Sequence, residues 1–390
     1  MHDDRSRHPS VPPRALHDSA SADGEPVTGL TGLSRNQSII ALVVIGGFFF
    51  FPLYAGPFRT DQLGLFLCYV IFALSLDLIW GFTGILSLGN AIYFGGGAYF
   101  IGLALKLQYA ATHATRYGEG AIPDFMTWNG LTEIPGWMRP LQNVWFAAPI
   151  GVLAMGFLAF VFGVITFKRH IYGVYCAVIT LAESVIFEEL IIEKQAYTGG
   201  FNGITDYGSY SGSVHFYWVI LAVTVFFFWL SRKLTTTHFG MILRSIRENE
   251  LRSEFFGFEV ANYKIFVFAV AAMMSAVAGG LYAALNGIVS HQDIGPILSI
   301  EGVIWVAVGG RGTLIGSMVG AILVKGAQSL LSEQFAWFWD LLVGFMFILV
   351  IVLMPDGIVG TLLRRARRRR ALAAGRLPAY DATRIEETPT

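Results

Sequence analysis

Long apolar runs, separated by short polar stretches, make up most of the chain. A helix needs about 20 apolar residues to cross the roughly 30 Å hydrocarbon core of a bilayer. The runs of that length cover residues 38–57, 62–80, 85–106, 144–167, 171–192, 214–231, 264–289, 313–331 and 336–354. The pattern predicts an all-α fold, a polytopic membrane protein with a transmembrane domain over residues 38–360.

A shorter apolar run, residues 298–309, ends in the sequence Gly-Gly-Arg-Gly at 309–312. A helix of this length reaches only about 18 Å at 1.5 Å per residue. The run is therefore expected to be tilted, re-entrant or one half of a helix broken by glycines.

Composition agrees with the membrane prediction. Hydrophobic residues make up 54% of the 390 residues and charged residues only 14%, against about 25% in an ordinary soluble domain. Most of the charges lie in residues 1–37, 232–264 and 361–390. The remaining surface carries too few charges to face water, which excludes a soluble globular enzyme.

Basic clusters predict the topology, because cytoplasmic loops are rich in Lys and Arg. The clusters at 168–170, 232–264 and 364–370 are expected inside. Three long runs lie between the clusters at 232–264 and 364–370. Because both clusters are expected on the same side, the number of crossings between them must be even, so the short run 298–309 must count as a fourth span. The prediction is about ten spans with both termini cytoplasmic, a cytoplasmic loop 232–263 and an ordered, aromatic-rich extracytoplasmic loop 107–143.

The two ends of the chain are polar. Residues 1–37 contain prolines and no apolar pattern, so they are predicted to be a disordered cytoplasmic tail. Residues 361–390 form a basic cytoplasmic tail that anchors to anionic membrane lipid. A nucleic-acid partner is not expected.

Glycine-rich segments mark two further breaks, residues 81–90 and 198–206. Non-helical backbone at membrane depth must be buried or line a polar cavity. Ser87 and Asn90 lie three residues apart and can present a hydroxyl and an amide to a small polar solute, or bond neighbouring helices. Segment 198–206 is either a rigid docking lip outside the membrane or a plain turn-rich loop.

Ionisable residues inside spans are functional candidates by default. Glu183 is near mid-span, and Glu301 can accept hydrogen bonds from the N–H groups of a neutral solute. Asp77 can equally cap a helix or bond a neighbouring one, and Glu188 is expected to be wet. The complete set is Asp77, Glu183, Glu188, Glu189, Glu301, Lys325 and Asp340.

Signals of enzyme chemistry are missing from the sequence. The two cysteines, Cys68 and Cys176, lie in apolar runs without metal-ligand spacing, so neither a metal nor another cofactor is expected. The chain contains no Gly-Lys dipeptide, which a phosphate-binding P-loop requires, and no His-Glu-x-x-His.

The cytoplasmic loop contains a segment, residues 238–257, that predicts one amphipathic helix ended by Gly257. Such a helix either lies on the membrane or docks into a groove of a cytoplasmic partner. In the second case, charged side chains would fix its orientation: Arg244, Arg247, Glu248 and Glu250.

Three segments resemble motifs of permease subunits in the branched-chain amino acid class of ABC importers. The first, Gly240-x4-Ser-Ile-Arg-Glu-Asn-Glu-x6-Gly257, resembles the coupling segment of that class. The others are Thr-Gly-x2-Ser-Leu-Gly-Asn at 83–90 and Thr-Gly-Gly-x-Asn-Gly-Ile at 198–204. The resemblance covers about residues 50–360.

Finer similarity points to the urea-type branch of this class. It lies in residues 77–84, 123–129 and 299–314, with Arg311 at the double-glycine break. The sequence Arg-Ser-Glu at 252–254 departs from the small residues expected midway through the coupling segment.

The resemblance implies a bacterial inner-membrane subunit without ATPase activity of its own. It would pair with a homologous second permease, two cytoplasmic ATP-binding subunits and a periplasmic substrate-binding protein. The residues implied in coupling to the ATPase are Arg244, Arg247, Glu248, Asn249, Glu250 and Gly257.

The sequence thus predicts half of a translocation path for urea or a related small amide, lined by Ser87, Asn90, Glu183 and Glu301. One alternative keeps the importer and changes the cargo to branched-chain amino acids, whose two charges each need an anchor. A passive solute channel would leave the amphipathic inner segment without a role. A membrane-embedded enzyme would need a nucleophile and base that the sequence does not display.

Overall fold

The computed structural model describes residues 46–112, 122–169, 171, 173–335, 344 and 357–361. In these residues the regular structure is helical, and the one β-bridge pairs Ile204 with Val289. The all-α prediction is therefore confirmed. The chain divides into two units, Met1–Tyr54 and Ala55–Thr390, and the first contributes a helix over residues 46–54.

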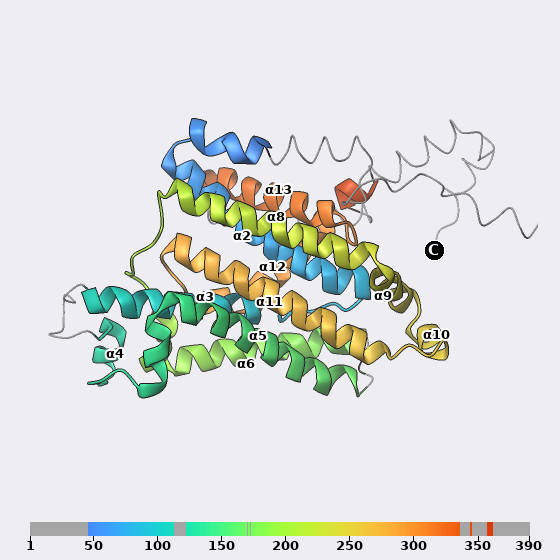
Figure 1. Cartoon of the computed structure of the whole chain (residues 1–390), viewed down its shortest axis with the longest axis horizontal. Helices are drawn as coiled ribbons and strands as arrows, with labels where there is room; N and C mark the ends of the chain where they lie inside the picture. Colours follow the sequence, from blue (N-terminus) through green and yellow to red (C-terminus); the bar gives the residue numbers. More distant parts are fainter. Residues whose placement is uncertain are drawn as a thin grey trace, which may run out of the picture. The chain divides into compact units, whose positions relative to one another are not determined.

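Three helices form the centre of the larger unit. They are α2 (Pro57–Leu76), which continues into the π-helix η1 (Asp77–Thr83), α3 (Asn90–Thr112) and α11 (Val260–Asn286). Helix α11 packs against both α2 and α3 (Figure 1). Their buried side chains supply much of the apolar core.

Glycines let α3 and α11 approach closely. A Cβ atom on Gly97 would lie 2.0 Å from the carbonyl oxygen of Ala276, and one on Gly279 would lie 1.8 Å from that of Phe94. These distances leave no space for a side chain, so the small residues fix the separation of the two helices.

The outer helices α5 (Val144–Phe167), α6 (Val174–Glu193) and α8 (Val214–Thr236) expose large apolar side chains. Trp145 is 87% exposed on α5, and Phe226 is 52% exposed on α8. Apolar surface of this extent suits hydrocarbon rather than water.

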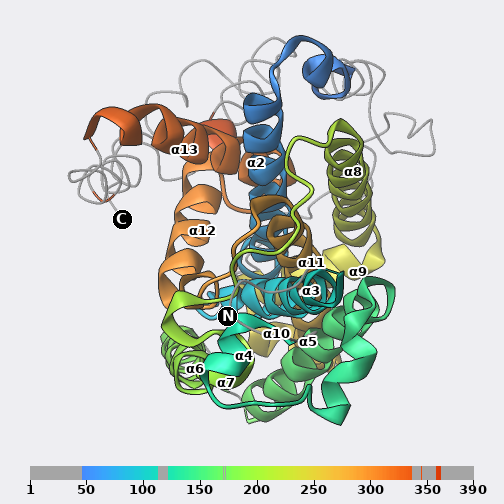
Figure 2. The ribbon, with the colours of Figure 1, turned by 90° about the vertical axis from the view of Figure 1, so that its left-hand side faces the viewer.

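Helices α12 (Pro296–Gly309) and α13 (Leu314–Phe335) meet at the predicted glycine break. The two are bent by 117° relative to each other (Figure 2). Gly310 adopts φ +123°, a conformation that L side chains rarely adopt. The bend fits a re-entrant segment or one half of a broken helix, two of the three possibilities expected for this run.

Short helices complete the described chain. At one end lie α4 (Asp124–Trp128), η2 (Gly136–Gln142), α7 (Gln195–Thr198), η3 (Gly200–Asn202) and η4 (His291–Asp293). The other end carries α9 (His238–Glu248) and α10 (Glu250–Phe255). Figure 1 shows α4 and α10 at opposite ends of the larger unit, as the predicted outer and inner loops require.

The predicted number of spans goes beyond what the described residues contain. Four helices are long and apolar enough to cross a membrane, or five if α12 and α13 together form one bent span. Helix α6 carries several glutamates, and the run 336–354 lies outside the described residues except for residue 344. The count of ten and the orientation of the termini stay predictions, as do the two tails at 1–37 and 361–390, which lie outside the described residues except for residue 361.

The close packing of α3 and α11 makes a testable prediction. Gly279→Ala should lower the free energy of unfolding in detergent by about 1–3 kcal/mol, because the added methyl overpacks the interface. Gly326→Ala on α13 is the matched control, since no atom lies within 4 Å of its added Cβ. The control should be neutral or slightly stabilising, and an equal loss in both variants would contradict the packing argument.

Candidate functional site

Asn90 joins three helices at the centre of the molecule. Its Nδ2 donates to Ser75 Oγ at 3.0 Å and to Ser275 Oγ at 2.9 Å. The two serine hydroxyls lie 2.7 Å from each other. The amide nitrogen therefore has the structural role that was the alternative for Asn90, whereas its Oδ1 is buried without a hydrogen-bond partner in the described part of the chain.

Two other path candidates also carry a buried oxygen that is unpartnered among the described residues. They are Ser87 Oγ, in the segment before α3, and Glu183 Oε2 on α6. The backbone of this segment packs on α6, because Leu88 N–H donates to Thr180 Oγ1 at 3.0 Å. Buried polar atoms normally have a protein or water partner, so these oxygens are available to a polar solute or to water.

Glu301 differs from these candidates because it is already paired. Its Oε2 accepts a hydrogen bond from Lys325 Nζ at 2.7 Å, across the bend between α12 and α13. Glu301 and Lys325 lie in separate apolar runs of the sequence, and only the bend brings them together.

At the predicted outer end, the glycine segment 198–204 is fastened to the loop after α11. Ile204 N–H donates to Val289 O at 2.8 Å, and Val289 N–H donates back at 3.0 Å. Gly199 and Gly203 both have positive φ, and a Cβ on Gly203 would lie 2.0 Å from Val289 O. These contacts support the rigid-lip interpretation over a plain loop.

A contact between a histidine and a carboxylate lies at the same end. Glu188 Oε1 lies 2.8 Å from His291 Nδ1, and the Phe201 ring stacks on the imidazole at 4.7 Å between centroids. Glu188, which was expected to be wet, is 23% exposed and also has this partner within the chain. Nearby, burial raises the pKa of Asp293 to about 6, although Ser290 N–H donates to its carboxylate.

At the opposite end, the π-helix η1 receives two arginines from distant parts of the chain. Arg247 of α9 donates to the carbonyl of Gly81. Arg311, in the glycine break, donates through Nε to the carbonyl of Trp80 at 3.1 Å and stacks on the Trp80 ring. These contacts give Arg311 a structural role at the end of η1.

Asp77 completes this junction, which consists of η1, α9 and residues 310–313. Its Oδ1 accepts a hydrogen bond from Gly312 N–H at 2.7 Å. The carboxylate thereby fixes the glycine break against the end of α2. This is the inter-helix role that was one of the two interpretations of Asp77.

The amphipathic segment 238–257 forms two helices, so the prediction of one continuous helix is wrong. Asn249 interrupts it with an extended backbone (φ −160°), and its Oδ1 accepts from Arg252 N–H at 2.9 Å as the N-cap of α10. A side chain that caps a new helix competes with continuation of the old one. Gly257 follows α10 with φ +86°, as the predicted terminator.

Most of the coupling candidates are exposed, although several contact distant parts of the chain. Glu250 pairs with the buried Lys264 of α11, and Arg244 stacks on the Phe82 ring at 5.6 Å. The exposed side chains among the candidates are those of Arg244, Arg247, Glu248 and Asn249. Three large apolar side chains beside them are also exposed: Leu251, Phe255 and Phe256, at 63%, 89% and 73%. This combination of exposed apolar and charged groups suits a protein partner.

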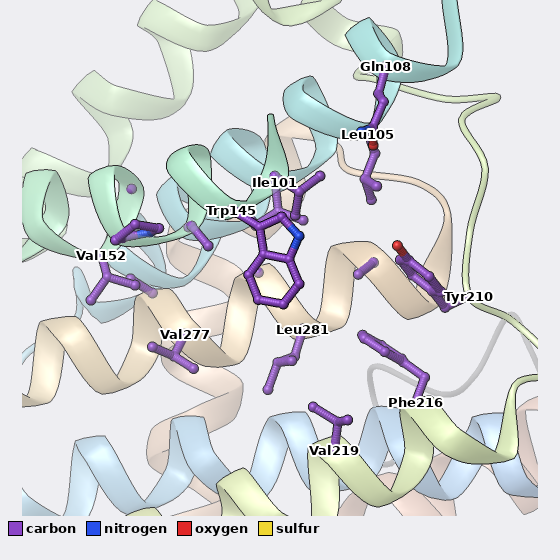
Figure 3. Close-up of a pocket in the computed structure, with 18 of the residues that line it drawn as sticks. Ile101, Leu105, Gln108, Trp145, Val152, Tyr210, Phe216, Val219, Val277 and Leu281 are labelled. Atoms are coloured by element: carbon purple, nitrogen blue, oxygen red, sulfur yellow. The ribbon is translucent and has the colours of Figure 1, made fainter. Parts of the chain in front are cut away.

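The described helices also enclose an open cavity of about 810 Å³ between α3, α5, α8 and α11. Figure 3 shows Trp145, Ile101, Leu281 and Phe216 around it, with Gln108 and Tyr210 among the few polar groups. None of the four path candidates lines it. Its apolar walls suit hydrocarbon rather than a hydrophilic solute.

A metal or redox centre has no support in the described residues. No three His, Cys, Asp or Glu side chains lie together there as a metal site would require. Cys68 and Cys176 are free and buried.

Comparison with known families gives one match over most of the chain. The family described as "Branched-chain amino acid transport system / permease component" matches residues 59–351. No solved structure matches the chain.

Curated relatives are permease proteins. The chain is 23% identical over 351 residues to the high-affinity branched-chain amino acid transport system permease protein LivM of Escherichia coli, covering 82% of this chain and 74% of the relative. It is 24% identical over 324 residues to a probable LivM of Methanocaldococcus jannaschii, covering 75% and 90%. A shorter match, 27% over 142 residues, relates it to the LivH permease protein of Salmonella typhimurium, covering 36% of this chain and 44% of that protein.

The contact between Asp77 and the glycine break can be tested directly. Asp77→Ala should lower the free energy of unfolding by about 1–3 kcal/mol, because Gly312 N–H loses its acceptor. Asp77→Asn is the matched control, since its amide oxygen can still accept that bond. Unfolding in detergent measures both, and equal stability of the alanine variant and the parent would contradict the assigned role.

Proposed function

Because this chain belongs to the family of branched-chain amino acid transport permease components, we propose that it forms half of the translocation path for urea or a related small amide in an ATP-driven importer. The observation that carries the proposal is the junction of α9 with η1 and the glycine break. It links the exposed segment that we place in the cytoplasm to α12, which carries Glu301, and to η1, which is followed by the segment that carries Ser87.

The junction provides a mechanical route from the cytoplasmic face. A displacement of α9 would be transmitted through Arg247 to the carbonyl of Gly81, and so to α2. Asp77 and Gly312 would carry it on to the bend between α12 and α13. ATP-driven closure of the partner subunits can thus alternate the helices between inward and outward states.

The proposed function requires several partner proteins. The proposed assembly contains a homologous second permease subunit, two cytoplasmic ATP-binding subunits and a periplasmic substrate-binding protein, in a bacterial inner membrane with both termini cytoplasmic. The relatives include both LivM and LivH permease proteins of branched-chain amino acid transport systems, which supports the pairing of two permeases. Ordered outer segments such as α4 and η2 offer the binding protein a surface.

Urea is supported as the solute by residue chemistry and by the similarity of residues 77–84 and 299–314 to the urea-type branch. Urea offers several N–H donors and one carbonyl acceptor. Asn90 Oδ1 and Glu183 Oε2 are buried acceptors that have no partner among the described residues, and Ser87 adds a hydroxyl. Glu301 contributes a carboxylate whose present partner is Lys325.

A second candidate solute is a branched-chain amino acid. The names of the relatives favour it, and so does the Glu301–Lys325 pair, which offers an anchor for each charge of a zwitterion.

Uptake measurements separate the two solutes. A strain lacking this gene should lose ATP-dependent uptake of labelled urea and keep leucine uptake, and the full chain should restore urea uptake to the parental level. Leucine uptake lost while urea uptake persists would replace urea by an amino acid. Urea uptake that continues after ATP depletion would instead favour a passive channel.

The coupling role predicts different behaviour for two neighbouring residues. Glu248→Ala should leave stability unchanged, since the side chain is exposed, yet lower solute uptake by about fivefold or more, because an interface hot spot is worth over about 1 kcal/mol. Arg247→Ala should lower both uptake and thermal stability, because it also removes the bond to Gly81. The exposed Arg59 near the start of α2 provides the control Arg59→Ala. The coupling role would be refuted if both Glu248→Ala and Arg247→Ala kept uptake and solute-stimulated ATPase activity at parental levels.

A further inference from the structure

The wall formed by α2, α12 and α13 holds its ion pair between aromatic rings. Lys325 Nζ, which donates to Glu301 Oε2, also lies 4.7 Å from the centre of the Tyr69 ring and 5.1 Å from that of Trp305. Cations are attracted to aromatic faces at such distances. Figure 2 shows the three helices side by side, and each contacts the other two.

The polar residues on this wall form a strip. Glu301 and Trp305 are one turn apart on α12, and Lys325 and Ser329 are one turn apart on α13, so each pair shares a helix face. Gln62 of α2 donates to the Ser329 hydroxyl. A second polar contact therefore lies along the same wall, beyond the ion pair.

An ion pair at membrane depth is poorly explained by stability alone. Desolvation of two charges costs about as much as their attraction returns, and apolar replacements are often as stable. The pair is also accessible, because the Glu301 side chain is 28% exposed and the Lys325 side chain 11% exposed. Ionisable groups that are costly, accessible and inside a membrane protein are typical of a solute pathway.

We propose that Glu301 and Lys325, framed by Tyr69 and Trp305, are this chain's recognition site for the transported solute. The inference rests on the proposed function and deepens it. The carboxylate accepts an N–H bond from the solute, and the ammonium donates to its carbonyl oxygen. The partly exposed Tyr69 ring packs against the planar face of the amide, and the buried Trp305 ring holds the ammonium in place.

The arrangement keeps both charges satisfied throughout a transport cycle. In the empty state the two side chains bond each other. A solute with adjacent donor and acceptor groups enters between them and replaces one direct bond by two. A planar amide has this pattern, and an amino acid offers the same chemistry through its ammonium and carboxylate, so both solutes are used in the test.

The first experiment measures initial uptake rates of labelled urea and, separately, leucine, each at a concentration well below saturation, where the rate reports solute affinity. Full-length variants are expressed with the native partner subunits in the gene-deletion strain, at matched membrane levels. Lys325→Met and Glu301→Gln should each lower the rate about tenfold or more, because a charge-assisted hydrogen bond is worth about 1.5–3 kcal/mol. Lys194→Met, which removes an exposed Lys–Glu pair outside this wall, is the control and should keep the parental rate.

The second experiment separates recognition from a structural pair. Exchanging the charges in one chain, Glu301→Lys with Lys325→Glu, rebuilds the attraction but reverses the positions of donor and acceptor. Uptake should stay impaired, and Glu301→Gln should reduce the preference for urea over acetamide, which lacks the second NH2 group. Parental uptake in the exchanged variant, with unchanged preference, would identify a purely structural pair and overturn the inference.

The outcomes test the recognition site separately from the proposed importer function. Parental rates in both single variants would refute the recognition site and leave the importer assignment intact. Failure of the unmodified chain to restore ATP-dependent uptake of urea or leucine would refute the proposed function, and the recognition site with it. Loss of urea uptake alone would assign the site to amides, whereas loss of leucine uptake alone would assign it to amino acids.

Discussion

Backbone carbonyls released at the end of a membrane helix impose the constraint on which the inner half of this structure depends. A helix leaves its last carbonyls without intrahelical partners, and hydrocarbon supplies no water to satisfy them. At the end of α2 the carbonyls of Trp80 and Gly81 are satisfied by the side chains of Arg311 and Arg247. The requirement for hydrogen bonds therefore holds the cytoplasmic segment and the glycine break on the same helix end.

This junction explains why the inner end is built from irregular pieces. The π-helix η1, the bend of 117° between α12 and α13 and the capped interruption at Asn249 each place a backbone turn next to a side chain that can satisfy it. A continuous helix in any of these positions would form its own backbone hydrogen bonds and would not need partners from the other segments. The irregular elements thus couple parts of the chain that regular helices would leave independent.

Much of the fold could be predicted from the sequence because its signals are local. Apolar runs of sufficient length gave helices close to the expected boundaries, and the glycines at 309–312 and at Gly257 ended helices as expected. The interruption at Asn249 was missed, although Asn is a frequent N-cap residue, because the apolar positions on both sides approximate one helical stripe.

The contacts of the candidate site could not be predicted, because they join residues far apart in the sequence. Arg247 and Gly81 are 166 positions apart, and His291 and Glu188 are 103 apart. Glu301 and Lys325 are closer in sequence but meet only through the bend. Which buried oxygens have no partner among the described residues, as in Ser87 and Glu183, also depends on the final packing.

The pairing of Glu301 with Lys325 has an electrical consequence. Moving one elementary charge across a membrane potential changes the free energy by about 2.3 kcal/mol per 100 mV. The two opposite charges lie on adjoining helices, 2.7 Å apart, and they cancel when α12 and α13 move together. Such a movement carries no net charge from this pair through the membrane field. The pair itself therefore adds no voltage dependence to the conformational equilibrium.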